Sequence, residues 1–206
     1  MELPNKENLW TWGMSLALYS KPWRAIGETP EKTTQGEMIN LYKYHEEINY
    51  ATRKRIAKAF TSEVFALLAK ELRRKFPTSK KSPFDVCVGL PENRGTGRSL
   101  PKEICELLAD EHAWLKNGFE GVIKTRTGEV IKGIPHDERP GRVEGLYAID
   151  RHKMPSPEFG FLIIDDVFET GSTVSGLCKT LEKEYPGVPR YIIALTHLHA
   201  TERMAK

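Results

Sequence analysis

The segment from Phe161 to Thr173 constrains the fold of this chain more than any other part of the sequence. It begins with the apolar run Phe161–Ile164, which predicts a strand buried on both faces. A pair of carboxylates, Asp165 and Asp166, follows directly, and a helical pattern runs on from Thr173. An apolar strand that passes through a short acidic turn into a helix is typical of an α/β protein with a parallel sheet.

The remaining elements repeat this alternation. Apolar residues at helical spacing predict a long amphipathic helix over 48–76, and a second helix is expected over 100–114. This order predicts a doubly wound, mainly parallel sheet covered by helices on both faces, a fold that binds ligands at the carboxyl ends of its strands. The further strands are expected at 85–90, 119–124, 145–150 and 191–195.

Residues 1–48 differ in composition from the rest of the chain. They are rich in aromatic residues and broken by prolines and glycines, and Trp10, Trp12 and Trp23 supply most of their apolar bulk. We therefore expect an N-terminal accessory segment over 1–48 and a single α/β domain over 49–206.

Charge and cysteine content narrow the class of protein. The 31 basic and 28 acidic residues give a net charge of +3, so charge alone does not imply a nucleic-acid partner. The 3 cysteines form no CxxC pair, which is typical of buried thiols in a reducing compartment. The longest apolar stretch near the N-terminus, Met14 to Tyr19, is too short to span a membrane, so we expect a cytoplasmic protein without membrane contact.

The acidic pair and the turn after it offer complementary chemistry. Carboxylates at the end of a buried strand accept hydrogen bonds from sugar hydroxyls. The backbone amides at the start of the following helix attract an anion such as a phosphate. Together these groups match the two ends of a ribose 5-phosphate. The residues expected to bind such a ligand are Asp165, Asp166, Thr170, Gly171, Ser172 and Thr173.

Two other interpretations of this segment remain open. One is a purely structural acidic turn, followed by a helix that serine and threonine cap. The other is a nucleoside triphosphatase, in which an apolar strand ending in Asp-Asp holds magnesium. The chain contains no G-x-x-x-x-G-K-[ST] phosphate loop, which counts against this second interpretation.

Two further loops follow predicted strands and carry cations. The loop after 85–90 combines glycines with arginines, which suit a diphosphate, although a solvated surface turn has the same composition. The stretch after 119–124 begins at Lys124 and Arg126 and stays polar, which predicts a mobile loop over 125–142 that closes on a ligand. The candidate pyrophosphate ligands in the first loop are Arg94, Gly95 and Arg98.

Residues 161–173 resemble the signature of type I phosphoribosyltransferases, in which an apolar strand and two acidic residues precede a Thr-Gly-x-Thr phosphate loop. Over roughly 40–198 the chain is also similar to the ComF family of competence-associated, amidophosphoribosyltransferase-like proteins. It departs from that family because no cysteine precedes Cys87 and because Glu169 replaces a small hydroxyl residue. The elements that carry the second resemblance are Tyr42-Lys43-Tyr44, Lys124-Thr125-Arg126, Lys132-Gly133-Ile134, Arg139 to Arg142 and Gly145-Leu146-Tyr147.

The resemblance implies an enzyme that uses phosphoribosyl pyrophosphate with Mg²⁺. It would transfer phosphoribose to a nitrogen nucleophile and release pyrophosphate. Asp165 and Asp166 would orient the ribose hydroxyls directly or through the metal, which makes both residues candidate metal ligands, directly or through water. Glu169 would act as acid or base toward the nucleophile. The residues with an implied catalytic role are Glu169, Asp165, Asp166, Lys124 and Arg126.

The same resemblance leaves a non-catalytic alternative. The chain could serve as a phosphoribosyl-ligand sensor, or as a ComF-like interaction module in DNA uptake or processing. Such a module would need the phosphate loop, but it would need neither Glu169 nor the cationic loop over 124–142. A homodimer is common in the resembled fold, and residues 1–48 are a candidate hood over the ligand site.

Overall fold

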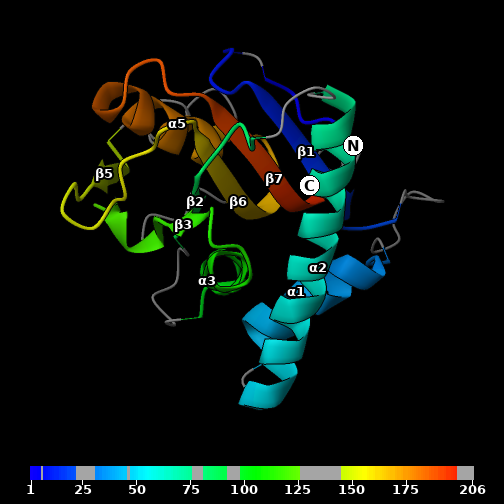
Figure 1. Ribbon diagram of the computed structural model, residues 1–206. Coiled ribbons are helices and arrows are strands. Elements are labelled where there is room, and N and C mark those ends of the chain that lie inside the picture. Colours follow the sequence, from blue (N-terminus) through cyan, green and yellow to red (C-terminus); the bar gives the residue numbers. More distant parts are fainter. Residues whose placement is uncertain are drawn as a thin grey trace.

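The computed structural model describes residues 1–5, 7–21, 31–45, 47–75, 81–91, 98–125 and 145–198. At its centre lies a five-stranded sheet in the order β1-β7-β6-β2-β3, in which every pair of neighbours is parallel. Figure 1 shows the long strands β1, β7 and β6 side by side. The strands of this sheet are β1 (Trp12–Leu18), β2 (Val86–Gly89), β3 (Lys116–Asn117), β6 (Phe161–Phe168) and β7 (Arg190–His197).

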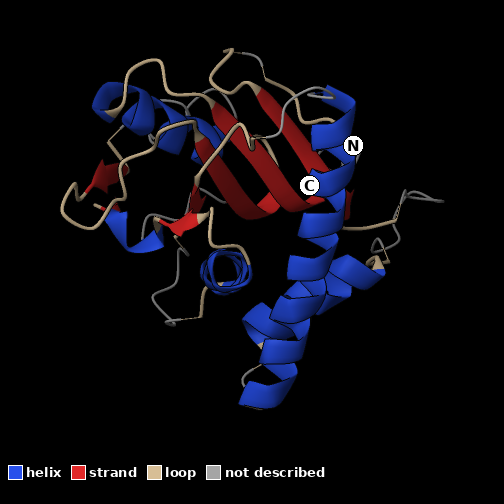
Figure 2. Ribbon diagram, viewed as in Figure 1, coloured by secondary structure: helices blue, strands red, loops and turns tan. Residues whose placement is uncertain are grey.

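Helices cover both faces of the sheet, as Figure 2 shows. Along β6, Phe161 and Ile163 pack into the apolar cluster that contains Leu177 of the helix α5. Leu162 and Ile164 pack into the opposite cluster, which α1, α2 and α3 complete. The predicted α/β fold with a doubly wound, mainly parallel sheet is therefore confirmed. The helices are α1 (Thr34–Tyr44), α2 (Tyr50–Lys75), α3 (Leu100–Glu111) and α5 (Ser172–Glu184).

The N-terminal residues contribute the edge strand β1. Trp12 lies opposite Tyr191 of β7, and the parallel pairing continues along the strand. Thr33 then caps α1, because its hydroxyl accepts a hydrogen bond from the Gly36 N–H at 3.0 Å. Part of the segment expected to be accessory therefore belongs to the sheet itself.

The expected strands at 119–124 and 145–150 do not join the main sheet. A 3-10 helix, η1 (Phe119–Gly121), precedes β4 (Val122–Lys124), which pairs antiparallel with β5 (Tyr147–Ile149). The short strand β3 instead takes the place beside β2. The expectation that these segments extend the parallel sheet is therefore wrong, because η1 separates β4 from the strand β3 that joins that sheet.

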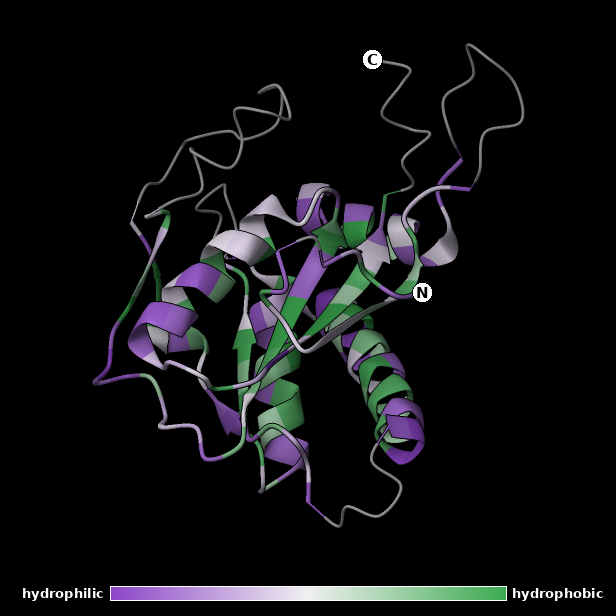
Figure 3. Ribbon diagram, turned by 90° about the horizontal axis from the view of Figure 1, so that it is seen from above, coloured by the Kyte–Doolittle hydropathy of each residue, from purple (hydrophilic) through white to green (hydrophobic). Residues whose placement is uncertain are grey.

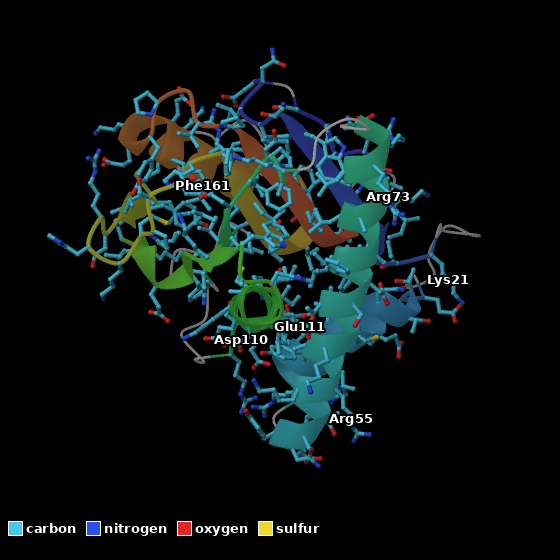
Figure 4. The ribbon with its side chains drawn as sticks, in the orientation of Figure 1. Lys21, Arg55, Arg73, Asp110, Glu111 and Phe161 are labelled. Atoms are coloured by element: carbon cyan, nitrogen blue, oxygen red, sulfur yellow. The ribbon has the colours of Figure 1, made fainter. Side chains whose placement is uncertain are left out.

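The long helix α2 corresponds closely to the expected amphipathic helix. Its buried residues include Phe60 and Val64, and the basic residues of its last turn are exposed. Figure 4 shows Arg55 and Arg73 on the outside of α2, whereas Phe161 lies among the strands. Figure 3 shows the same contrast, with hydrophobic colours along the central strands and hydrophilic colours at the end of α2. Within the described ranges, no helix is both long and apolar enough to cross a membrane.

Candidate functional site

The carboxyl end of β6 extends beyond its neighbour β2. Pairing of these strands ends with Gly89 opposite Ile164, and the Leu90 N–H then donates to the Ile164 carbonyl at 3.0 Å. On its other side, β6 pairs with β7 as far as Phe168 opposite His197. The acidic pair therefore lies within the strand and not in the turn that the sequence predicted, because β7 continues the parallel pairing past it.

The side chains of Asp165 and Asp166 point toward opposite faces of the sheet, because adjacent residues of a strand alternate between its two faces. Asp165 lies opposite Ala194, which belongs to the cluster under α5, and is 8% exposed. Asp166 points toward α1, where its Oδ2 atom forms an ion pair with the Lys43 ammonium. A ligand that contacts both carboxylates must therefore lie across the end region of β6.

Burial and neighbouring charges set the protonation of this pair. Loss of hydration, followed by the charge of Asp166, raises the Asp165 pKa to about 7, although Lys43 favours the ionised form. Burial alone would lower the pKa of Lys43, but the charge of Asp166 and its hydrogen bond raise that pKa above its ordinary value. The site thus combines a carboxylate that is paired with an ammonium and a second carboxyl group whose pKa is raised by burial and by its neighbour.

Hydrogen bonds between Thr170 and Ser172 stabilise the turn that follows β6. The Thr170 hydroxyl accepts a hydrogen bond from the Ser172 N–H at 3.2 Å and lies 2.7 Å from the Ser172 hydroxyl. Gly171 follows Thr170 with a φ of 78°, and its carbonyl accepts from the Ser175 N–H at 2.7 Å. The first N–H groups of a helix have no acceptor within it, so the amides around Thr173 can bind an anion.

The two-stranded sheet places Lys124 and Tyr147 opposite each other. Its strand β5 lies beside α5, where the Thr180 hydroxyl donates to the Tyr147 carbonyl at 3.5 Å. The Tyr147 hydroxyl is buried and has no hydrogen-bond partner in the described part of the chain. Burial and then the charges of Asp165 and Asp166 raise the Tyr147 pKa, so this hydroxyl lies within electrostatic reach of the acidic pair.

The residues on either side of the expected diphosphate loop lie near the carboxyl end of β2, the strand beside β6. The Leu90 N–H donates a hydrogen bond to the Ile164 carbonyl of β6. Ser99 caps α3, because its hydroxyl accepts a hydrogen bond from the Lys102 N–H at 3.2 Å. Arg98 therefore stands directly before the start of a helix. Arg94 and Gly95 of this loop lie outside the described residues. So do Arg126 and the predicted mobile loop beyond Thr125.

Sequence reasoning missed two residues of this site, Lys43 and Tyr147. Both belong to elements that carry the ComF resemblance, but neither had an expected role. The signal that could have found them is chemical: a lysine between two tyrosines and a tyrosine within an apolar strand both need polar partners when buried. Glu169 is half-buried between the end of β6 and Thr170, and its role stays a prediction.

The acidic pair does not fit direct coordination of a metal ion. Carboxylate oxygens suit Mg²⁺, but this ion requires several oxygen ligands in near-octahedral geometry. Here the Lys43 ammonium already engages Asp166, and Asp165 faces the opposite layer. In the residues that the structure describes, no group of three or more His, Cys, Asp and Glu side chains could hold a metal ion.

A cavity of about 760 Å³ lies at the other end of the sheet. The second half of α2 and the residues that precede β2 and β6 line it, and these residues mark the amino ends of parallel strands. Three exposed aromatic side chains, Phe65, Trp114 and Phe159, gather around it. Because the acidic pair lies toward the carboxyl ends, this cavity is separate from the candidate site.

Comparisons with known proteins include two similar solved structures. An adenine phosphoribosyltransferase is 15% identical with a TM-score of 0.39, and the match covers 72% of this chain and 76% of that chain. A hypoxanthine phosphoribosyltransferase from Staphylococcus aureus is 19% identical with a TM-score of 0.36; the match covers 70% of this chain and 64% of that protein, slightly under two thirds. No protein-family model and no curated protein matches. Neither similarity assigns a function to this chain, and the ComF resemblance stays a prediction.

Proposed function

We propose that this chain binds a 5-phosphoribosyl ligand along Asp165 to Thr173. It transfers phosphoribose from phosphoribosyl pyrophosphate to a nitrogen nucleophile and releases pyrophosphate. One observation carries the proposal: the acidic pair on β6 and the left-handed Gly171 at the start of α5 belong to one continuous segment. Acceptors for sugar hydroxyls and donors for a phosphate therefore follow each other directly along the chain.

Each group has a separate task in this reaction. Asp165 and Asp166 accept hydrogen bonds from the ribose hydroxyls and stabilise the positive charge that develops at the anomeric carbon. The start of α5 holds the 5-phosphate, so that remote binding energy positions the reacting carbon. Glu169 accepts the proton of the attacking nitrogen, or holds that nitrogen by a hydrogen bond. The cations proposed to offset the charge on departing pyrophosphate are Lys124, Arg94, Arg98 and Arg126.

Magnesium belongs to this proposal as the counter-ion of the diphosphate. Because Lys43 engages Asp166 and Asp165 faces the opposite layer, direct coordination of the ion by the carboxylates is not part of the proposal. A magnesium ion that accompanies the diphosphate would supply positive charge to the leaving group.

Calorimetry of the full chain with phosphoribosyl pyrophosphate and Mg²⁺ tests binding. A screen for pyrophosphate release against purines, pyrimidines, ammonia and glutamine then tests turnover and identifies the nitrogen acceptor. We expect binding that weakens about tenfold or more in Asp165→Asn, because that carboxylate meets the sugar. Absence of binding, or equal affinity in the wild type and the variant, would contradict the proposal.

A non-catalytic role is the second candidate function. The ion pair between Lys43 and Asp166 favours it, because a ligand that binds Asp166 would compete with the Lys43 ammonium, so that its binding would change the position of that side chain. Binding without pyrophosphate release for any acceptor would support this candidate. The cytoplasmic location, the homodimer and a partner in DNA processing stay predictions.

A further inference from the structure

Lys43 supplies the counter-charge of the acidic pair. Its ammonium contacts Asp166 Oδ2, and the two side chains are only 22% and 16% exposed. The neighbouring Asp165 is 8% exposed on the same strand. A positive charge from α1 is therefore built into the partly buried end of β6.

The packing of α1 holds this lysine in place. Tyr42, the preceding residue, is fully buried, and its hydroxyl donates to Glu103 Oε1 of α3 at 2.6 Å. Ile39 is also fully buried, and the Thr33 hydroxyl donates to the Leu18 carbonyl at the other end of the helix. Because both ends of α1 are anchored, the ammonium reaches Asp166 from a fixed helix and not from a mobile segment.

The arrangement of charges argues against a divalent ion at the same place. Mg²⁺ and Mn²⁺ prefer a shell of oxygen ligands, and one Asp166 oxygen is already engaged by the ammonium. A second cation there would also be repelled by Lys43, and charges interact more strongly in a partly buried site than in water. The two carboxylates face different layers, so an ion on the α1 side of β6 would have to bind Asp166, the carboxylate that Lys43 already engages.

We propose that Lys43 is the resident cation of the acidic pair and excludes divalent metal ions from it. Sugar hydroxyls then meet the carboxylates directly, while magnesium stays on the diphosphate. The role toward the sugar rests on the proposed function. The exclusion of metal ions rests on the ion pair alone.

Manganese titration of the full chain, without any phosphoribosyl ligand, tests this inference. Electron paramagnetic resonance of free Mn²⁺ measures binding to the wild type, Lys43→Met and Lys43→Arg. We expect a new site about tenfold or more tighter than wild-type binding in Lys43→Met, and no gain in Lys43→Arg, which keeps the charge. Lys179→Met is the matched control and should gain no site, because it removes only an exposed ion pair with Glu7.

Adding Asp166→Asn to Lys43→Met should abolish the new site. A wild-type Mn²⁺ site that Asp166→Asn removes would overturn the inference. So would a Lys43→Met chain that keeps its circular dichroism spectrum and binds no more Mn²⁺ than the wild type. If Lys43→Met does not fold, the comparison of wild type with Asp166→Asn decides: equal Mn²⁺ binding supports the inference and a loss contradicts it. No phosphoribosyl ligand is present, so these outcomes do not depend on the proposed function.

Discussion

A Cβ atom on Gly171 would lie 2.7 Å from the Cζ atom of Phe168, whose side chain is 1% exposed. The backbone of Gly171 also has a φ of 78°, a region that side chains rarely adopt. The proposed phosphate turn and the core under α5 therefore meet at the same glycine.

Gly171→Ala is expected to disturb both binding and stability. The left-handed backbone and the contact with Phe168 should together lower the free energy of unfolding by about 1 to 3 kcal/mol. Affinity for ribose 5-phosphate should fall about tenfold or more, because the turn must shift. Urea denaturation and calorimetry measure the two effects. Gly187→Ala is the control, since Gly187 has a φ of 73° but no atom within 4 Å of an added Cβ; it should show the backbone cost without the loss of affinity.

Thr173→Val should weaken phosphate binding without unfolding the chain. The variant keeps the branched shape of the side chain but removes a partly exposed hydroxyl in the first turn of α5. Loss of a hydrogen bond to a charged phosphate corresponds to about 1.5 to 3 kcal/mol of binding free energy. Thr61→Val, in α2, removes a hydroxyl that donates to the Ala57 carbonyl at 2.9 Å and should leave affinity unchanged. If calorimetry gives both variants the same affinity for ribose 5-phosphate as the wild type, the Thr173 hydroxyl does not bind the phosphate.

Glu169→Gln should separate turnover from binding. The amide keeps the size of the side chain but cannot accept the proton of the nucleophile, and such acid–base roles contribute on the order of 10² to 10⁴ in rate. We expect kcat to fall about tenfold or more while affinity for phosphoribosyl pyrophosphate stays nearly constant. Steady-state pyrophosphate release measures kcat. An unchanged kcat would reduce Glu169 to a charge near the start of a helix.

The local part of this site could be predicted from the sequence. Phe161 to Ile164 form a fully apolar run, and such a run suits a strand with helices on both sides. Gly171 lies between hydroxyl residues that commonly start a helix, and α5 begins beside it. In both cases a few adjacent residues are enough to predict the local structure.

The contacts between distant segments could not be predicted in the same way. The strand β1 contains Gly13 and the buried Ser15, which interrupt its apolar pattern, and its register with β7 depends on packing. The ion pair of Lys43 with Asp166 likewise depends on how α1 docks against the sheet. A single sequence shows that these residues need partners but not which partners they have.

The stability of the chain should depend on pH through Asp165. Its pKa is raised to about 7 from an ordinary value of 3.8, so between these values the folded chain holds a proton that the unfolded chain has released. Protonation of Asp165 therefore favours the folded state. As pH rises from about 4 to 7, the free energy of unfolding should fall through this group by at most about 1.4 kcal/mol per pH unit. Denaturation of the wild type and Asp165→Asn from about pH 4 to pH 8 measures how the free energy of unfolding of each depends on pH. Parallel stability profiles would contradict a raised pKa.

Tyr147→Phe should affect ligand binding and stability in opposite directions. The Tyr147 hydroxyl is buried without a hydrogen-bond partner among the described residues, and such a group costs about 1 to 3 kcal/mol. Its removal should leave the free energy of unfolding unchanged or raise it by about 1 kcal/mol. If the hydroxyl donates to the phosphoribosyl ligand, affinity should fall about tenfold, since the bond to the ligand is lost. Tyr191→Phe, a buried tyrosine in the opposite cluster, is the control and should bind as the wild type does. A stabilised Tyr147→Phe chain with wild-type affinity would show that this hydroxyl faces no ligand.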